Sequence, residues 1–173
     1  MCLKSRRGNV LFEFALAGIP IMLLIISVIE ISRAMWTYCT LSYAVTEGAR
    51  RAIVGGEDCG LYPNFCTTTV SIIAQKIYAS SPRLSALMTV TLSSSGGGPT
   101  FTCKPPLSGC ISGLGVGNQN GKQFPGNPPG SDVIITATYP FTSPLTMFFP
   151  GLTSSTGGIT TILRATSQEP IQF

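Results

Sequence analysis

The amino-acid sequence predicts an α+β protein. A long N-terminal transmembrane and stalk helix precedes a small disulfide-pinned head with one further helix and a small antiparallel sheet. Three observations predict this class. The segment from Phe14 to Ile29 is apolar and carries no charge. Helical spacing then continues to a stop signal at Gly55-Gly56. Beyond that signal, short segments of alternating polarity lie among four cysteines.

Three parts are expected along the chain. Residues 1–8 are a basic leader, residues 9–54 the transmembrane and stalk helix, and residues 55–173 the head, with a Gly/Pro-rich loop over 93–131. Basic residues precede the apolar segment, and such residues favour the cytoplasmic side of a membrane. The sequence therefore predicts a single-pass protein with a cytoplasmic N-terminus and an extracytoplasmic C-terminal head.

The apolar segment is short for a membrane span. Its sixteen residues from Phe14 to Ile29 rise about 24 Å, whereas the hydrocarbon core is about 30 Å thick. Counting from Asn9 gives twenty-one residues, which is long enough. The Glu13 carboxylate then lies in or at the edge of the membrane, where an ionisable group is unfavourable. Pro20 has no N–H and is expected to weaken or kink the helix.

Two interpretations of Glu13 remain open. In the first, the helix is an uncleaved signal anchor whose Glu13 reaches the inner headgroups beside the arginines of the leader. In the second, Gly8 and Glu13 form a prepilin-like processing site. Cleavage between Gly8 and Asn9 would leave Glu13 as the fifth mature residue. A secretory signal peptide fits less well, because no small-x-small cleavage site follows Ile29.

Helical spacing continues beyond the apolar segment. One helix from about Leu11 to Val54 would be about 65 Å long. Glu30 and Arg33 are three residues apart and are expected to form an exposed ion pair, worth tenths of a kcal/mol. The expected packing face of the stalk consists of Ile31, Met35, Tyr38, Leu41, Val45, Ala49 and Ala52.

The head is expected to combine one helix with three strands. The helix covers Thr67–Ser80, with its cap within Thr67–Thr69 and a stop at Pro82. The segment 93–131 contains ten Gly and six Pro and is expected to be a loop. The strands are expected to pack on the helix and the outer end of the stalk, and they cover Leu87–Leu92, Asp132–Thr138 and Ile159–Ala165.

Four cysteines of the head fall into two C-x6-C pairs. Two disulfides are expected in an oxidising compartment, and of the three connectivities we favour Cys59–Cys66 and Cys103–Cys110. A zinc site with four thiolates is the alternative, although the spacing lacks the usual knuckle. Cys39 in the stalk is interpreted as a small buried helix-face residue rather than a reactive thiol.

The composition argues against several function classes. The chain contains no His, which excludes His-based triads and His metal sites. Charged residues are 10% of the chain, against about 25% in an ordinary soluble domain. Glu57-Asp58 is interpreted as a solvated loop, and Gly113–Gly117 lacks the flanking strand and helix of a phosphate loop. We therefore expect no enzyme, no cofactor, no metal and no nucleic-acid partner.

Several motifs resemble those of the TadE/TadG-like family, the bitopic envelope proteins of tight-adherence (Flp) pilus machinery. The likeness covers about residues 6–52, with weaker echoes at 132–141 and 162–165. The motifs that carry it are Arg7-Gly8, Val10, Glu13-Phe14-Ala15-Leu16, Pro20, Glu30, Arg33-Ala34 and Glu47-Gly48-Ala49-Arg50.

The resemblance implies a pseudopilin-like structural subunit of pilus assembly or secretion in the bacterial inner membrane. Implied partners are the membrane, other pilus or secretion subunits and a prepilin peptidase. It also implies that Glu13 pairs with the amine of a neighbouring cleaved subunit. Two alternatives stay open. One is an uncleaved membrane-anchored adhesion or ligand-binding module that uses Phe101, Phe124 and the Cys103/Cys110 clamp, and the other is a minor pseudopilin of a general secretion system.

Overall fold

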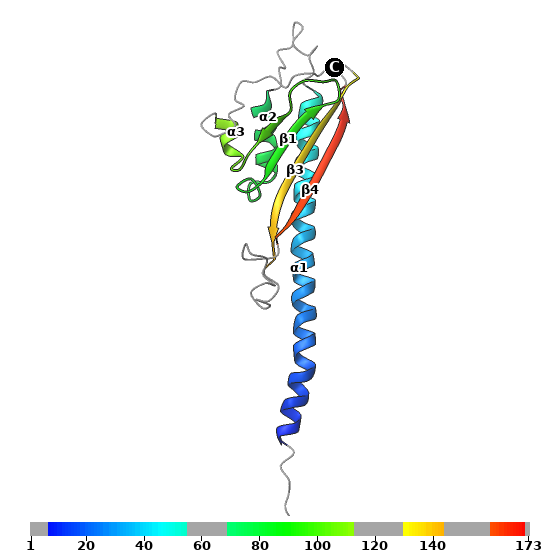
Figure 1. The fold of residues 1–173 in the computed structure, drawn as a ribbon, viewed down its shortest axis with the longest axis vertical. Helices are drawn as coiled ribbons and strands as arrows, with labels where there is room; N and C mark the ends of the chain where they lie inside the picture. Colours follow the sequence, from blue (N-terminus) through cyan, green and yellow to red (C-terminus); the bar gives the residue numbers. More distant parts are fainter. Residues whose placement is uncertain (1–6, 55–68, 113–129, 144–159, 172–173) are drawn as a thin grey trace, which may run out of the picture. The chain divides into compact units, whose positions relative to one another are not determined.

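The computed structural model describes residues 7–54, 69–112, 130–143 and 160–171. They form two compact units. The anchor unit contains residues 7–35 and Ser143, and the head unit contains the other described residues. The predicted class is confirmed: a long N-terminal helix precedes an α+β head (Figure 1). The elements are α1 (Arg7–Ile53), α2 (Val70–Ser80), β1 (Thr89–Ser94), β2 (Phe101–Cys103), α3 (Ser108–Ser112), β3 (Asp132–Thr142) and β4 (Thr160–Pro170).

Helix α1 is continuous over 47 residues. It begins at Arg7, four residues before the expected start at Leu11, because adding a turn to an existing helix costs far less than starting one. Pro20 lies inside the helix and cannot donate to the carbonyl of Leu16, yet the helix continues past it. Its first part belongs to the anchor unit, and its last eighteen residues, from Trp36 to Ile53, belong to the head unit.

The head unit contains one antiparallel sheet with the strand order β2-β1-β3-β4. The register pairs Leu92 of β1 with Phe101 on one side and with Ile135 on the other. Strands β3 and β4 pair along their full length, from Asp132–Pro170 to Thr142–Thr160. Alternate side chains face the core, as strand geometry requires. The buried ones are Val90, Leu92, Phe101, Cys103, Val133, Ile135, Ala137 and Ala165.

The sheet has four strands, not the expected three. The expected loop over 93–131 was wrong in its described part, because it contains β2 and α3. Strand β2 has only three residues, too few for a periodic pattern, and its pairing with β1 buries Phe101 and Cys103 around the exposed Thr102. Residues 113–129 lie outside the described residues. The pairing of β2 with strand β1, and not a local sequence pattern, therefore determines the structure of Phe101–Cys103.

Several strand boundaries also differ from expectation. Strand β1 begins at Thr89 instead of Leu87, because the amides of Leu87 and Met88 both donate to the carbonyl of Leu84 and hold a turn. Strands β3 and β4 extend past the expected Thr138 and Ala165. The two strands form backbone hydrogen bonds with each other along their full length. The free energy of this pairing outweighs the low strand propensity of the polar residues in β4.

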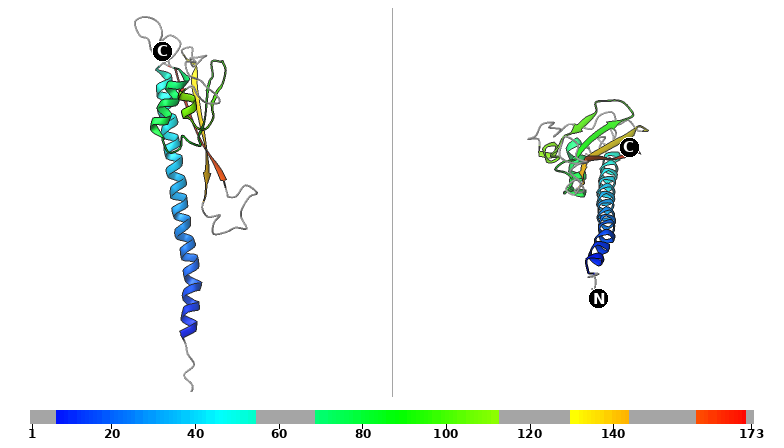
Figure 2. Two further views of the ribbon diagram at one scale, coloured as in Figure 1. Left: turned by 90° about the vertical axis from the view of Figure 1, so that its left-hand side faces the viewer. Right: turned by 60° about the horizontal axis from the view of Figure 1, so that its bottom comes forward.

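Helix α2 follows its sequence signals closely. The Thr69 side chain accepts a hydrogen bond from the amide of Ile72, so the predicted cap lies at Thr69. The Ser81 amide donates to the carbonyls of Ile77 and Tyr78, and Pro82 follows. Within the head unit, the end of α1 and helix α2 lie together on one side of the sheet (Figure 2). The unit therefore has a helix layer and a sheet layer.

Gly48 marks the closest approach of α1 to α2. A Cβ atom at this position would lie 2.6 Å from Cγ1 and 2.8 Å from Cδ1 of Ile77. Three other core residues of this part of α1 are also small: Ala44, Ala49 and Ala52, all fully buried. Small side chains on one helix face allow two helix axes to approach closely. A Cβ at Gly48 would therefore require the end of the Ile77 side chain to move.

We predict that Gly48→Ala destabilises the head. Overpacking costs about 1–3 kcal/mol and outweighs the roughly 1 kcal/mol gain in helix propensity. In an Ile77→Ala background the opposing atoms are absent, so Gly48→Ala becomes stabilising by up to about 1 kcal/mol. Chemical denaturation of the full chain in detergent micelles measures both effects. Gly18→Ala is the control, because a Cβ there meets nothing within 4 Å. Equal effects in both backgrounds would contradict this account.

Candidate functional site

The first part of α1 exposes apolar side chains on every side. Phe14 is 77% exposed, Leu24 is 66% exposed and Ile29 is 54% exposed. A helix that is apolar all round is typical of a membrane span. Among the described residues, α1 is the one helix that is long and apolar enough to cross a membrane. The predicted membrane-helix residues Phe14, Pro20 and Ile29 all lie on this exposed apolar surface.

Two serine hydroxyls in the anchor unit are satisfied within the helix. The Ser27 hydroxyl donates to the carbonyl of Leu23 at 2.8 Å, and the Ser32 hydroxyl donates to the carbonyl of Val28 at 2.8 Å. Such bonds to the preceding turn let hydroxyl groups lie in an apolar environment without an unpaired donor. The two serines are therefore compatible with a membrane span.

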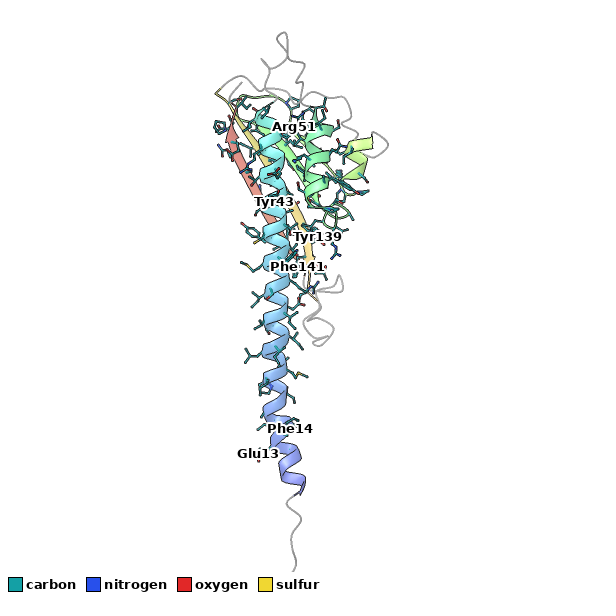
Figure 3. The ribbon with its side chains drawn as sticks, turned by 180° about the vertical axis from the view of Figure 1, so that it is seen from behind. Glu13, Phe14, Tyr43, Arg51, Tyr139 and Phe141 are labelled. Carbon is teal, nitrogen blue, oxygen red and sulfur yellow. A yellow bond between two sulfur atoms is a disulfide. The ribbon has the colours of Figure 1, made fainter. Side chains whose placement is uncertain are left out.

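The predicted processing-site residues lie in the first two turns of α1. Gly8 and Asn9 follow directly after Arg7, where the helix begins. Glu13 is exposed, and its side chain projects from the helix next to Phe14 (Figure 3). The Gly8–Asn9 bond therefore lies in the first turn of α1, and helix ends open more readily than helix interiors. Cleavage at this bond stays a prediction.

The predicted ion pair between Glu30 and Arg33 is confirmed, with 2.9 Å between Oε1 and the guanidinium. The expectation that this pair is exposed was wrong for Glu30, which is 8% exposed. The Ser143 hydroxyl donates to its other oxygen, Oε2, at 3.0 Å. Both carboxylate oxygens thus have a donor, as a buried charge requires. The sequence gives no signal of Ser143, which is 113 positions away from Glu30.

Glu47 joins α1 to α2 beside the Gly48 contact. Its carboxylate lies 3.4 Å from the Arg50 guanidinium and 3.4 Å from the Lys76 ammonium. Ion pairs near the surface contribute little to stability, so this pair mainly fixes the register of the two helices. The motif Glu47-Gly48-Ala49-Arg50 therefore contacts α2 at two positions: Gly48 lies against Ile77, and Glu47 pairs with Lys76. The sequence indicated the motif but not Lys76.

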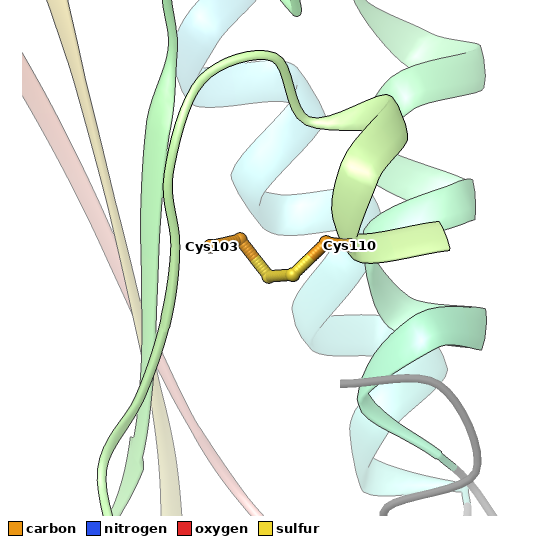
Figure 4. The surroundings of a disulfide bond; sticks show 2 residues. All are labelled: Cys103 and Cys110. Carbon is orange, nitrogen blue, oxygen red and sulfur yellow. A yellow bond between two sulfur atoms is a disulfide. The ribbon is translucent and has the colours of Figure 1, made fainter. Parts of the chain in front are cut away.

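A disulfide joins Cys103 at the end of β2 to Cys110 in α3, with 5.7 Å between the Cα atoms (Figure 4). This confirms one of the two predicted local pairs. It also takes two of the four sulfurs that the zinc alternative needs. Cys59 and Cys66 lie outside the described residues, so their pairing stays a prediction. Within the described ranges, no three His, Cys, Asp or Glu residues form a group suited to a metal ion.

Two other interpretations need correction. Cys39 is exposed, not buried as predicted. It lies two residues from the buried Leu41, which places the two side chains about 200° apart around the helix. Phe101 is 8% exposed and packs in the core, so it does not contribute to the binding surface that the adhesion alternative needs. Phe124 lies outside the described residues.

Fold and site together define a class: a protein with one long apolar N-terminal helix, suited to a membrane, and an α+β head. Within this class, residues 8–50 match the family model described as TadE-like protein. The predicted resemblance to the TadE/TadG-like family is thus confirmed over that segment. The match runs from Gly8 through Glu13 and Glu30 to the Glu47–Arg50 motif. No curated protein and no solved structure matches the chain.

We predict that replacing both Cys103 and Cys110 by Ser lowers the stability of the head by about 2.5 kcal/mol, the loop-entropy value for so short a ring. Thermal unfolding of the full chain in detergent measures the change. Cys39→Ser is the matched control and is expected to have no effect, because this thiol is free and exposed. Unchanged stability of the double variant would show that the disulfide does not support the head.

Proposed function

We propose that this protein is a structural component of pilus assembly or secretion, anchored in the bacterial inner membrane by α1. Its N-terminus is cytoplasmic and its head extracytoplasmic. One observation carries the proposal: the TadE-like match over residues 8–50 coincides with the one described helix that is apolar enough to span a membrane. The protein acts through binding and not catalysis, with the membrane and other pilus or secretion subunits as its partners.

The anchor associates with neighbouring pilin-like helices through small residues. Ala15, Ala17 and Gly18 lie within a single helical turn near the inner end of the span. A Cβ at Gly18 would meet nothing within 4 Å, so another helix has room to approach there. In lipid, close packing at small residues drives helix association. The head then presents its surface to other subunits.

A prepilin peptidase matures the chain by cleaving between Gly8 and Asn9. Two observations support this step: the TadE-like match begins at Gly8, and Glu13 is exposed on the helix. The new amine at Asn9 of one subunit pairs with Glu13 of its neighbour. Opposite charges attract strongly in a medium of low dielectric constant, so this pair sets the register of adjacent subunits.

The first prediction from this proposal concerns topology. A periplasmic reporter enzyme fused after Phe173 is expected to be active, and a cytoplasmic reporter fused at the same position is expected to be inactive. The reason is that the basic leader keeps the N-terminus in the cytoplasm, so the C-terminus lies on the other side of the membrane. Paired fusions of a periplasmic reporter and a cytoplasmic reporter measure the orientation. Activity of the cytoplasmic fusion would refute the proposed orientation of the head.

The second prediction concerns maturation. Gly8→Val is expected to abolish an eight-residue shortening of the chain when the cognate peptidase is present, because a larger side chain blocks the scissile bond. N-terminal sequencing of membrane-extracted protein measures it. Gly18→Val is the matched control and is expected to leave cleavage intact. Glu13→Ala is expected to be cleaved but to reduce the yield of assembled pili, since the partner of the neighbouring amine is gone.

Retention of Met1 through Gly8 in cells that make the peptidase would rule out processing while leaving membrane anchorage in place. Normal pilus assembly by Glu13→Ala would rule out the proposed pairing of Glu13 with a neighbouring amine.

A further inference from the structure

Several aromatic side chains lie at the end of the head unit that contains its first α1 residues, beginning at Trp36. Trp36 is 77% exposed and Tyr38 is 44% exposed. Strand β3 reaches the same end through Tyr139 and Phe141, which are half-buried (Figure 3). Its partner strand β4 adds Ile162, which is 70% exposed. No charged residue occurs between Ala34 and Thr46. A helix face in water normally carries charges, so water is not the expected surrounding here.

The arrangement around α1 indicates what covers these side chains. Trp36 and Tyr38 are two residues apart and therefore point about 200° away from each other. A partner helix or a flat protein surface covers one side of a helix and cannot cover both. The headgroup layer of a bilayer surrounds a helix on all sides. Trp and Tyr are enriched in that layer, because their rings combine an apolar body with a polar group.

The length of α1 fits the same location. Phe14 to Trp36 spans 22 residue steps, or about 33 Å, which matches a hydrocarbon core of about 30 Å. The segment from Phe14 to Ile29 rises only about 24 Å, so a span that ends at Ile29 has to begin near Asn9 and include Glu13. With the outer boundary at Trp36, Glu30 lies about 9 Å inside it. Its charge is paired with Arg33 and hydrogen-bonded by Ser143, the state expected of an ionisable group inside a membrane.

We propose that Trp36, Tyr38 and Phe141 form an aromatic collar that lies in the phospholipid headgroup layer of the outer leaflet, whereas Tyr139 packs against the head core. The proposal rests on the membrane anchorage proposed above and adds its depth. The outer boundary of the span is at Trp36 rather than at Ile29. The residues of α1 between Ile29 and Trp36, which were expected to lie in a water-exposed stalk, are thus part of the membrane span.

Trp36 is the only Trp of the chain, so its fluorescence reports on one position. The full-length protein is reconstituted into phosphatidylcholine–phosphatidylglycerol vesicles that contain lipids brominated either near the glycerol or near the chain ends. Acrylamide serves as the aqueous quencher. We expect the greatest loss of Trp36 fluorescence with bromine near the glycerol, a smaller loss with bromine at the chain ends, and partial quenching by acrylamide.

Three relocations of the Trp, each in a Trp36→Phe background, calibrate the measurement. Leu24→Trp lies at mid-span and is expected to be quenched most by bromine at the chain ends. Tyr78→Trp, on the half-exposed surface of α2, is expected to respond to acrylamide only. Tyr38→Trp tests the opposite side of the helix and is expected to match Trp36. Equal quenching of Trp at positions 36 and 38 indicates that lipid, and not a protein partner, surrounds the helix.

The outcomes separate this inference from the proposed function. If Trp36 responds like Tyr78→Trp, or is quenched most by bromine at the chain ends, the collar is refuted while a lipid-quenched Leu24→Trp still supports the anchor. If either collar position is shielded from lipid bromine and from acrylamide, a protein covers it and the collar is also refuted. If Leu24→Trp is not quenched by lipid, membrane anchorage itself fails.

Discussion

The head unit depends on the close contact between α1 and α2 at Gly48. The Ile77 side chain occupies the space that any Cβ at this position would fill. This contact brings the helix layer together over the buried face of the sheet, where Ile135 also lies within reach of Gly48. A dense interior has little room to adjust, so one atom at the centre affects every neighbour. The ion pair of Glu47 with Lys76 also joins the two helices.

One helix therefore has two kinds of surroundings along its length. Its first part exposes apolar side chains all round, and its last part has one buried face that forms part of the head core. The same α-helical backbone suits both, because its hydrogen bonds are satisfied internally in lipid as well as in a protein core. The TadE-like match covers both parts, from Gly8 to Arg50, and so includes the anchor together with its means of docking α2.

Two carboxylates on α1 differ in burial and in hydrogen bonding. Glu30 is buried, with a donor at each carboxylate oxygen, whereas Glu13 is exposed at the inner end. A charge in an apolar region needs such compensation, while a charge at an interface does not. The two carboxylates therefore differ in their surroundings: Glu30 is held by Arg33 and Ser143, whereas Glu13 is exposed.

The sequence by itself determined the features that depend on local chemistry. A long apolar and periodic segment predicted α1, Thr69 and Pro82 bounded α2, and a seven-residue spacing favoured the Cys103–Cys110 pair among three connectivities. Only the tertiary structure decided the features that depend on distant segments. These are the three-residue strand β2, the contacts Ser143–Glu30 and Lys76–Glu47, and the packing reason for Gly48. Each arises from residues that are far apart in the chain, and no local pattern records which of them will meet.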